Sequence, residues 1–223
     1  MDTVAVGLTL ASPPAMATSL LLVVHGRAGG VIPPELQSLA AELAQRRGAP
    51  VWLQALTAEL PVGLPGDERA FTLVPLMLLP GAHVRHDIPA IVRHWGAMAG
   101  VGRLGRVPFV GAWPAWQQAL AAEVRQLPSA GSQPPLLLHH PLEGGLGGRF
   151  LDHLARVSGA RLRATPYSAE ELAELQLSLS APALPLALAA NRLTDQLADR
   201  VGPPLLQRPR FRQVLLERLG ELP

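Results

Sequence analysis

The sequence has no cysteine, which excludes disulfide bonds, thiolate zinc sites, iron–sulfur ligation and a cysteine nucleophile. It also has no lysine, because all 19 basic residues are arginine. Without lysine the chain can form neither a Schiff base nor the lysine contact of a phosphate-binding P-loop. The formal net charge is only +2, so the pI near 10.3 reflects the high pKa of arginine. We therefore expect no nucleic-acid partner.

Long hydrophobic runs are absent as well. The longest apolar run near the start, Leu20 to Val24, is far shorter than the roughly 20 residues that a membrane-spanning helix needs. The only charged residue before it, Asp2, has the wrong sign for the start of a secretory signal. We therefore expect a cytoplasmic protein with no membrane partner. Residues 1–18 are expected to form a disordered tail, and the sequence leaves Met1 and Met16 open as the translation start.

Short apolar runs alternate with helical patterns along the first half of the chain. This alternation is typical of an α/β fold with a parallel sheet. If the order of its strands is 2-1-3-4, the first and third strands are neighbours. The expected strands are Leu20–Val24, Val51–Leu56, Phe71–Leu79 and Val107–Val110, and the expected helices run from Pro34 to Gly48, from about His83 to His94, and from Trp113 to Leu127.

The second half repeats the pattern of the first. The run Pro134 to Leu138, followed by two histidines, echoes Leu20 to His25, and Leu184-Pro185-Leu186 echoes Val74-Pro75-Leu76. An internal duplication is the simplest explanation. We expect an N-terminal lobe over residues 19–128, a linker over 129–134, and a C-terminal lobe over 135–223 that is a degenerate repeat. Under one constant shift, Pro114 aligns with Pro209, Trp116 with Phe211, and Leu120 with Leu215.

Two histidines follow expected strands in the first lobe. His25 comes directly after the first strand, and His83 lies just past the third. The carboxyl ends of neighbouring parallel strands form the ligand-binding crevice of open α/β sheets, so both imidazoles can reach one site. Neutral imidazole binds iron, cobalt, nickel and zinc, and it accepts protons near neutral pH. The other interpretation is that each histidine caps its strand through a backbone hydrogen bond.

Three segments around these histidines resemble the sirohydrochlorin chelatase family of the CbiX type. They are the apolar strand that ends in His25-Gly26, the segment V-P-L-x-L-L-x-G over Val74–Gly81, and the segment H-x-x-x-D-I-P over His83–Pro89. The resemblance implies a chelatase fold of two Rossmann-like lobes. It implies a lyase that inserts Fe²⁺ or Co²⁺ into sirohydrochlorin, for siroheme or cobalamin biosynthesis. The partners would be this tetrapyrrole and the divalent ion, with no cofactor besides the metal substrate.

The resemblance also implies roles for individual residues. His25 and His83 fall on the family's catalytic histidines, which act as metal ligands or proton acceptors. Asp87 would either orient a neighbouring histidine or stabilise the start of a helix through the helix dipole. Arg27 and Arg85 would pair with substrate carboxylates, because the substrate is a polycarboxylate, and Arg93 is a weaker candidate for the same role. His86, three residues after His83, is either a third ligand or an exposed helix residue.

The sequence departs from the family pattern at the end of the second strand. Family members often carry a glutamate there, but this chain has Gln54, which cannot accept a proton as a carboxylate does. Glu59, five residues on, is a candidate substitute. The departure leaves an alternative function open, namely a non-catalytic metal- or tetrapyrrole-binding protein that has lost turnover.

The second lobe has no matching pair of histidines. His139 and His140 stand where His25 would be, but residues 189–192, which echo the His83 region, contain no histidine. We therefore expect one site, in the first lobe, and we expect the second-lobe histidines to be dispensable for the chemistry.

Overall fold

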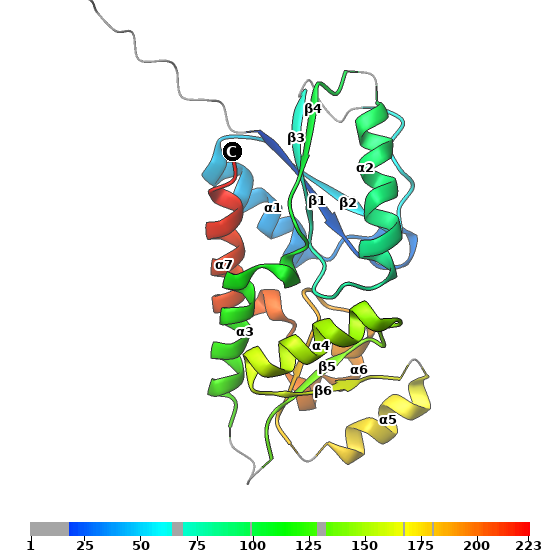
Figure 1. The fold of residues 1–223 in the computed structure, drawn as a ribbon, viewed down its shortest axis with the longest axis vertical. Coiled ribbons are helices and arrows are strands. Elements are labelled where there is room, and N and C mark those ends of the chain that lie inside the picture. The colour runs from blue at the N-terminus through cyan, green and yellow to red at the C-terminus, as the bar shows by residue number, and fades with distance from the viewer. Residues whose placement is uncertain (1–17, 64–68, 99, 129–132, 167, 180) are drawn as a thin grey trace, which may run out of the picture.

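The computed structural model describes residues 18–63, 69–98, 100–128, 133–166, 168–179 and 181–223. The expected α/β class is confirmed, with one parallel sheet in each half of the chain (Figure 1). The first half contains β1 (Ser19–Val24), η1 (Ala28–Gly30), α1 (Pro34–Arg47), β2 (Val51–Ala55), β3 (Ala70–Pro75), η2 (His83–Asp87), α2 (Ile88–Ala97), β4 (Arg103–Arg106), η3 (Val110–Ala112) and α3 (Pro114–Gln126).

The second half follows the first in outline, with shorter strands, but it adds helix α5 between β6 and β7, and its described residues include no counterpart of β4. Its three-stranded sheet has the order β6-β5-β7, which matches the β2-β1-β3 part of the first sheet. Its elements are β5 (Leu136–His139), α4 (Gly145–Ser158), β6 (Arg161–Ala164), α5 (Ala169–Ser178), β7 (Ala183–Pro185), α6 (Arg192–Val201), η4 (Leu205–Gln207) and α7 (Pro209–Gly220).

The first sheet has the strand order β2-β1-β3-β4, which is the condition under which the first and third strands are neighbours, and every neighbouring pair is parallel. Alternate residues of β1 face opposite sides, as strand geometry requires. Leu20, Leu22 and Val24 pack into a core that includes α1, whereas Leu21 and Val23 pack against α2. Helices therefore cover both faces (Figure 1). The helix that follows β1 and the helix that follows β3 cover opposite faces of the sheet. The carboxyl ends of these two neighbouring strands therefore lie at the topological switch point, where open α/β sheets form their ligand-binding crevice.

One predicted strand is wrong. The fourth strand is Arg103–Arg106 and not Val107–Val110, and Val110 begins the short helix η3. This strand lies at the edge of the sheet and pairs only with β3, so its two arginines stay exposed. An apolar run is a signal for interior strands and misses such an edge strand. The third strand also ends earlier than expected, at Pro75.

The last helix of each half connects the two lobes. α7 packs against α1 of the first lobe and against α3, and α3 packs against α4 of the second lobe. As a result, the largest hydrophobic core includes residues of both sheets, such as Leu22 and Leu137. The duplication places proline at equivalent positions, since Pro75 pairs with Val23 in one sheet and Pro185 pairs with Leu138 in the other.

Two expectations concern segments that the structure does not describe. The tail predicted over residues 1–18 lies almost wholly outside the described residues, as does most of the linker predicted over 129–134. The lobe boundaries set by that linker stay a prediction. Within the described ranges, no helix has both the length and the apolar character needed to cross a membrane.

Candidate functional site

The structure brings His25 and His83 together. Their ring centroids lie 4.9 Å apart, and the ring planes meet nearly edge to face, at 81°. One residue follows the carboxyl end of β1 and the other begins the helical segment after β3, as the sheet order predicts. Since an imidazole nitrogen binds a divalent ion at about 2.1 Å, two rings at this separation can share one ion.

The turn after β1 fixes the position of His25. Gly26 has a φ of +72°, and a Cβ atom there would lie 2.7 Å from Thr57 Oγ1 and 2.8 Å from Ala55 Cβ, so only glycine fits. The His25 Nδ1 atom lies 2.8 Å from the Gly26 carbonyl oxygen. A carbonyl only accepts, so Nδ1 carries the proton and the Nε2 lone pair is left for a ligand or a proton.

His83 opens a π-helical turn over His83–Asp87, and π-turns inside helices are frequent at functional sites. Its Nδ1 atom lies 2.5 Å from Asp87 Oδ2. The carboxylate accepts the Nδ1 proton and leaves Nε2 as the ligand atom, which is the carboxylate–histidine arrangement found behind many metal ligands. Asp87 makes no side-chain hydrogen bond to cap α2. The contact with His83 supports the histidine-orienting interpretation of Asp87, and the dipole interpretation, which needs no hydrogen bond, stays a prediction.

The predicted carboxylate-binding arginines lie at the contact between the lobes. Arg27 Nη2 is 3.2 Å from Asp195 Oδ2 of α6, in an ion pair that leaves both side chains about half exposed. A substrate carboxylate would have to compete with Asp195 for this guanidinium. Arg85 lies beside Gly144 of the second lobe, whose Cβ position is 3.7 Å from Arg85 Nη1. Arg93 is exposed farther along α2.

Gln54 is almost fully buried at the end of β2, with its amide nitrogen donating to the Ala55 carbonyl at 2.9 Å. Glu59 and Gln54 line one pocket of about 220 Å³ at the edge of the sheet, and neither His25 nor His83 lines it. The structure therefore gives no contact that makes Glu59 a substitute for the family's glutamate.

The remaining first-lobe histidines lie apart from the pair or face solvent. His86 is exposed on the π-helical turn. His94 Nε2 donates to the Pro61 carbonyl at 2.7 Å, which is a structural contact. Among the described residues, no group of three histidine, cysteine or acidic side chains is placed to hold a metal ion. A metal at His25 and His83 would keep open coordination positions for transfer.

Hydrogen-bond register identifies His140, and not His139, as the counterpart of His25. The Leu56 amide donates to the Val24 carbonyl in the first lobe, and the Thr165 amide donates to the His139 carbonyl in the second. His139 thus corresponds to Val24, and His140 to the residue after it. The adjacent histidines left this assignment open in the sequence. The internal repeat distinguishes His139 from His140 only once the register between β5 and β6 is known.

The two second-lobe histidines have different surroundings. His139 is buried, and its pKa lies below the usual value for histidine. Burial lowers the pKa by more than the hydrogen bond from its Nδ1 atom to the His140 carbonyl raises it. Surrounding protein atoms desolvate the His140 ring and lower its pKa, and the charges of His25, His139 and Arg192 lower it further. The charge of His25 acts on His140, so the two residues lie within electrostatic range of each other, a proximity that the sequence did not reveal.

The expected absence of a second histidine pair agrees with the register. Leu76 and Leu186 are equivalent, because their amides donate to the equivalent carbonyls of Val23 and Leu138. His83 lies seven residues after Leu76, and Leu193 lies seven residues after Leu186, so Leu193 occupies the position of His83. Leu193 is buried in the hydrophobic core of the second lobe.

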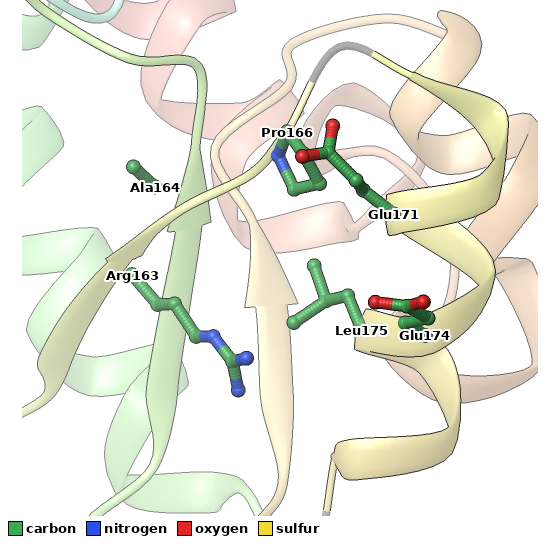
Figure 2. A pocket seen from close by; sticks show the side chains of 6 residues that line it. All are labelled: Arg163, Ala164, Pro166, Glu171, Glu174 and Leu175. Carbon is green, nitrogen blue, oxygen red and sulfur yellow. The ribbon is translucent and has the colours of Figure 1, made fainter.

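A second pocket of about 320 Å³ lies in the other lobe (Figure 2). Arg163 and Ala164 of β6 form one side, and Glu171, Glu174 and Leu175 of α5 form the other. None of the predicted site residues lines this pocket, so it is separate from the histidine pair.

No protein-family model matches the chain, and no curated protein matches its sequence significantly. Solved structures match it at low identity. SirB from Bacillus subtilis with Fe³⁺ is 18% identical, with a TM-score of 0.56, and the match covers 92% of this chain and 95% of that chain. The structure of CbiX, described as the terminal enzyme of siroheme biosynthesis in denitrifying bacteria, is 22% identical, with a TM-score of 0.56 and coverage of 90% and 96%.

A third match is to DR2241 from Deinococcus radiodurans, described as a multi-domain protein with structural similarity to chelatases. It is 19% identical, with a TM-score of 0.58, and the match covers 93% of this chain but 55% of that one. The resemblance found in the His-Gly and H-x-x-x-D-I-P segments and the structural matches point to the same group of proteins. The chain has the two-lobed fold of the sirohydrochlorin chelatase SirB and of CbiX.

Proposed function

We propose that the protein is a sirohydrochlorin chelatase of the CbiX type, a cytoplasmic lyase that inserts Fe²⁺ or Co²⁺ into sirohydrochlorin for siroheme or cobalamin biosynthesis. The observation that carries this proposal is the 4.9 Å separation of the His25 and His83 rings at the carboxyl ends of β1 and β3. A strand-capping role for each histidine separately gives no reason for the two rings to meet.

The chemistry needs few protein groups. Insertion forms bonds from the pyrrole nitrogens to the metal, releases the ligands that held the ion, and frees two N–H protons to bases or water. In our proposal His25 and His83 hold the divalent ion through Nε2, because each Nδ1 atom is engaged with Gly26 or Asp87. Two protein ligands bind the ion weakly enough to release it to the macrocycle.

Three further side chains have roles in this proposal. Asp87 fixes the tautomer and orientation of His83 and increases the basicity of its ligand nitrogen. Arg27 and Arg85 offer guanidinium groups to the acidic periphery of the substrate. No other cofactor has a role in this scheme.

The solved neighbours favour the same metals without choosing between them. One SirB structure is described with Fe³⁺ and another in complex with cobalt. Sites built from imidazole follow the general affinity order of the divalent metals, in which iron binds more weakly than cobalt and cobalt more weakly than nickel. Two histidines therefore do not by themselves decide which metal the protein uses.

Gln54 favours one alternative, a binding protein without turnover. Its side chain is buried and bonded to the backbone, so it supplies no carboxylate to the site. Such a protein would bind the metal or the tetrapyrrole and would leave the spontaneous rate of insertion unchanged.

Absorbance spectroscopy separates these functions. Purified protein is mixed with sirohydrochlorin and Fe²⁺, Co²⁺ or Ni²⁺ in turn, without oxygen, and the spectrum of the metallated product is followed against a protein-free mixture. A rate above the protein-free rate, dependent on His25, is the expected result. Binding of the tetrapyrrole with no increase in rate would support the alternative, and neither binding nor an increase would refute both.

A further inference from the structure

An ion pair between the two lobes begins in the turn that carries His25. Arg27 lies two residues after His25, and Asp195 lies in the first turn of α6 in the second lobe. Arg27 Nη2 donates to both carboxylate oxygens of Asp195, at 3.2 Å to Oδ2 and 3.4 Å to Oδ1. The guanidinium that we propose for the substrate's carboxylates is therefore occupied by a carboxylate of the chain itself.

The geometry of this ion pair is poor. A guanidinium and a carboxylate form their strongest contact when two nitrogens each donate to one oxygen, at about 2.7–2.9 Å. Here a single nitrogen donates to both oxygens, and both distances are longer. The Arg27 side chain is 46% exposed and the Asp195 side chain 50%, so water screens the attraction between them. A ligand carboxylate that engages two nitrogens of Arg27 would form the better contact.

Hydrogen bonds hold the backbone on both sides of this ion pair. The Arg27 amide donates to the Val31 carbonyl at 2.7 Å, and the Arg27 carbonyl accepts from Thr57 Oγ1 at 2.7 Å. Just before α6, the Ala190 amide donates to Glu35 Oε1 of the first lobe at 2.8 Å. Only the two side chains therefore need to move when a ligand enters, and the displaced carboxylate stays beside the guanidinium.

We propose that Asp195 competes with the tetrapyrrole for Arg27: it yields the guanidinium to an acidic side group of the substrate and takes it back when the product leaves. This inference rests on the proposed function and adds that binding exchanges one carboxylate for another. The displaced carboxylate remains near the incoming one, and like charges at short range repel each other. Substrate and product have the same acidic periphery, so Asp195 lowers the affinity for both and speeds product release.

The test is an equilibrium titration of the full-length protein with metal-free sirohydrochlorin, followed by absorbance. Asp195→Asn keeps the shape of the side chain and removes its charge, and Asp199→Asn makes the same change at an exposed aspartate of the same helix. We expect Asp195→Asn to lower Kd about threefold to fivefold, the effect of removing one exposed ion pair, and Asp199→Asn to leave Kd unchanged. An ion pair that only stabilises the fold predicts a higher Kd or no change.

Two further measurements show whether the effect passes through Arg27. In the Arg27→Ala background, Asp195→Asn should tighten binding less than it does in the wild type. Sodium chloride should weaken binding by Asp195→Asn more than binding by the wild type, because the variant gains an ion pair whereas the wild type exchanges one for another. Asp195→Ala, with melting temperatures for every variant, replaces Asp195→Asn if that variant does not fold.

Cobalt–sirohydrochlorin, prepared without the protein, tests the return of Asp195 to Arg27. It should dissociate more slowly from Asp195→Asn than from the wild type or Asp199→Asn, because no charged group of the chain takes back the guanidinium. Stopped-flow displacement measures these rates, and equal rates in all three proteins would contradict the exchange.

The outcomes separate this inference from the proposed function. A Kd for Asp195→Asn equal to or above the wild-type value, in a protein that still inserts metal, would overturn the exchange alone. Equal tightening by Asp195→Asn and Asp199→Asn, or undiminished tightening in the Arg27→Ala background, would also overturn it. A wild-type protein that neither binds sirohydrochlorin nor accelerates insertion would refute the proposed function, and the exchange with it.

Discussion

The rings of Trp116 and Phe211 pack against each other with centroids 4.8 Å apart. The two residues occupy the same position in the internal repeat, in α3 and α7, and both are almost fully buried. Equivalent residues of two repeats touch when they lie near the pseudo-twofold axis that relates the repeats. Because α3 and α7 also contact elements of both lobes, this aromatic pair lies where the lobes are held together.

Trp116→Ala should therefore destabilise the whole chain. The loss of a buried indole and the cavity it leaves cost about 3–5 kcal/mol in other cores. Gln118→Ala removes an exposed side chain from the same helix and is the matched control. Urea denaturation measures both, and a loss below about 1 kcal/mol for Trp116→Ala would contradict the central position of this pair.

Replacing either histidine of the pair should abolish most metal insertion. His25→Ala and His83→Ala each remove one of two proposed ligands, and we expect a fall in kcat/KM of about 100-fold or more. Both residues lie outside the hydrophobic core, so the melting temperature should change little. Steady-state kinetics measures kcat/KM, and thermal denaturation of the same samples measures the melting temperature.

His86→Ala is the control for this pair, because His86 is exposed on the same turn as His83. It should keep the wild-type rate. An equal loss of activity in His86→Ala would indicate that it is a third ligand, and wild-type rates in both His25→Ala and His83→Ala would refute the assignment.

Asp87 should act through His83. Asp87→Ala removes the acceptor that holds His83 Nδ1, and loss of such a partner typically costs 10–100-fold in metal affinity or activity. Asp87→Asn keeps an acceptor oxygen without the charge, so it should recover part of the loss. A dipole role alone would lower stability by up to about 1 kcal/mol and leave kinetics intact. Metal affinity, measured with rates and melting temperatures, distinguishes the two roles.

Stability should fall as the pH decreases below about 6.5, the pKa of histidine in an unfolded chain. Burial lowers the pKa of His139 in the folded protein. Between the folded and unfolded pKa values the unfolded chain binds more protons, so the free energy of unfolding decreases as the pH falls through this range. His140, whose pKa is also lowered, adds in the same direction.

His139→Val tests the effect of this buried group, because the equivalent residue of the first lobe is Val24. Its melting temperature should decrease less between pH 7.5 and pH 5 than that of the wild type. Parallel slopes for His139→Val and wild type would show that His139 does not couple folding to pH.

Sequence patterns predicted most of the fold because the interior strands of the first sheet, β1 and β3, are buried on both faces. Buried strands form continuous apolar runs, which identified β1, β2 and β3. The edge strand Arg103–Arg106 has no such run, and its position was wrongly assigned to the valines that follow. The aligned prolines and the pair of Trp116 and Phe211 made the duplication visible before any contact was known.

The sequence by itself determined that His25 and His83 follow strands, because residue order and apolar runs are local properties. It also indicated that the second lobe lacks a partner histidine, and Leu193 occupies that position. Only the tertiary structure decided that the two rings meet at 4.9 Å and that Asp87 holds His83. Only the packing of one lobe on the other pairs Arg27 with Asp195 and brings His140 toward His25. Contacts between residues far apart in the chain depend on how the sheets face each other, and no local pattern encodes that arrangement.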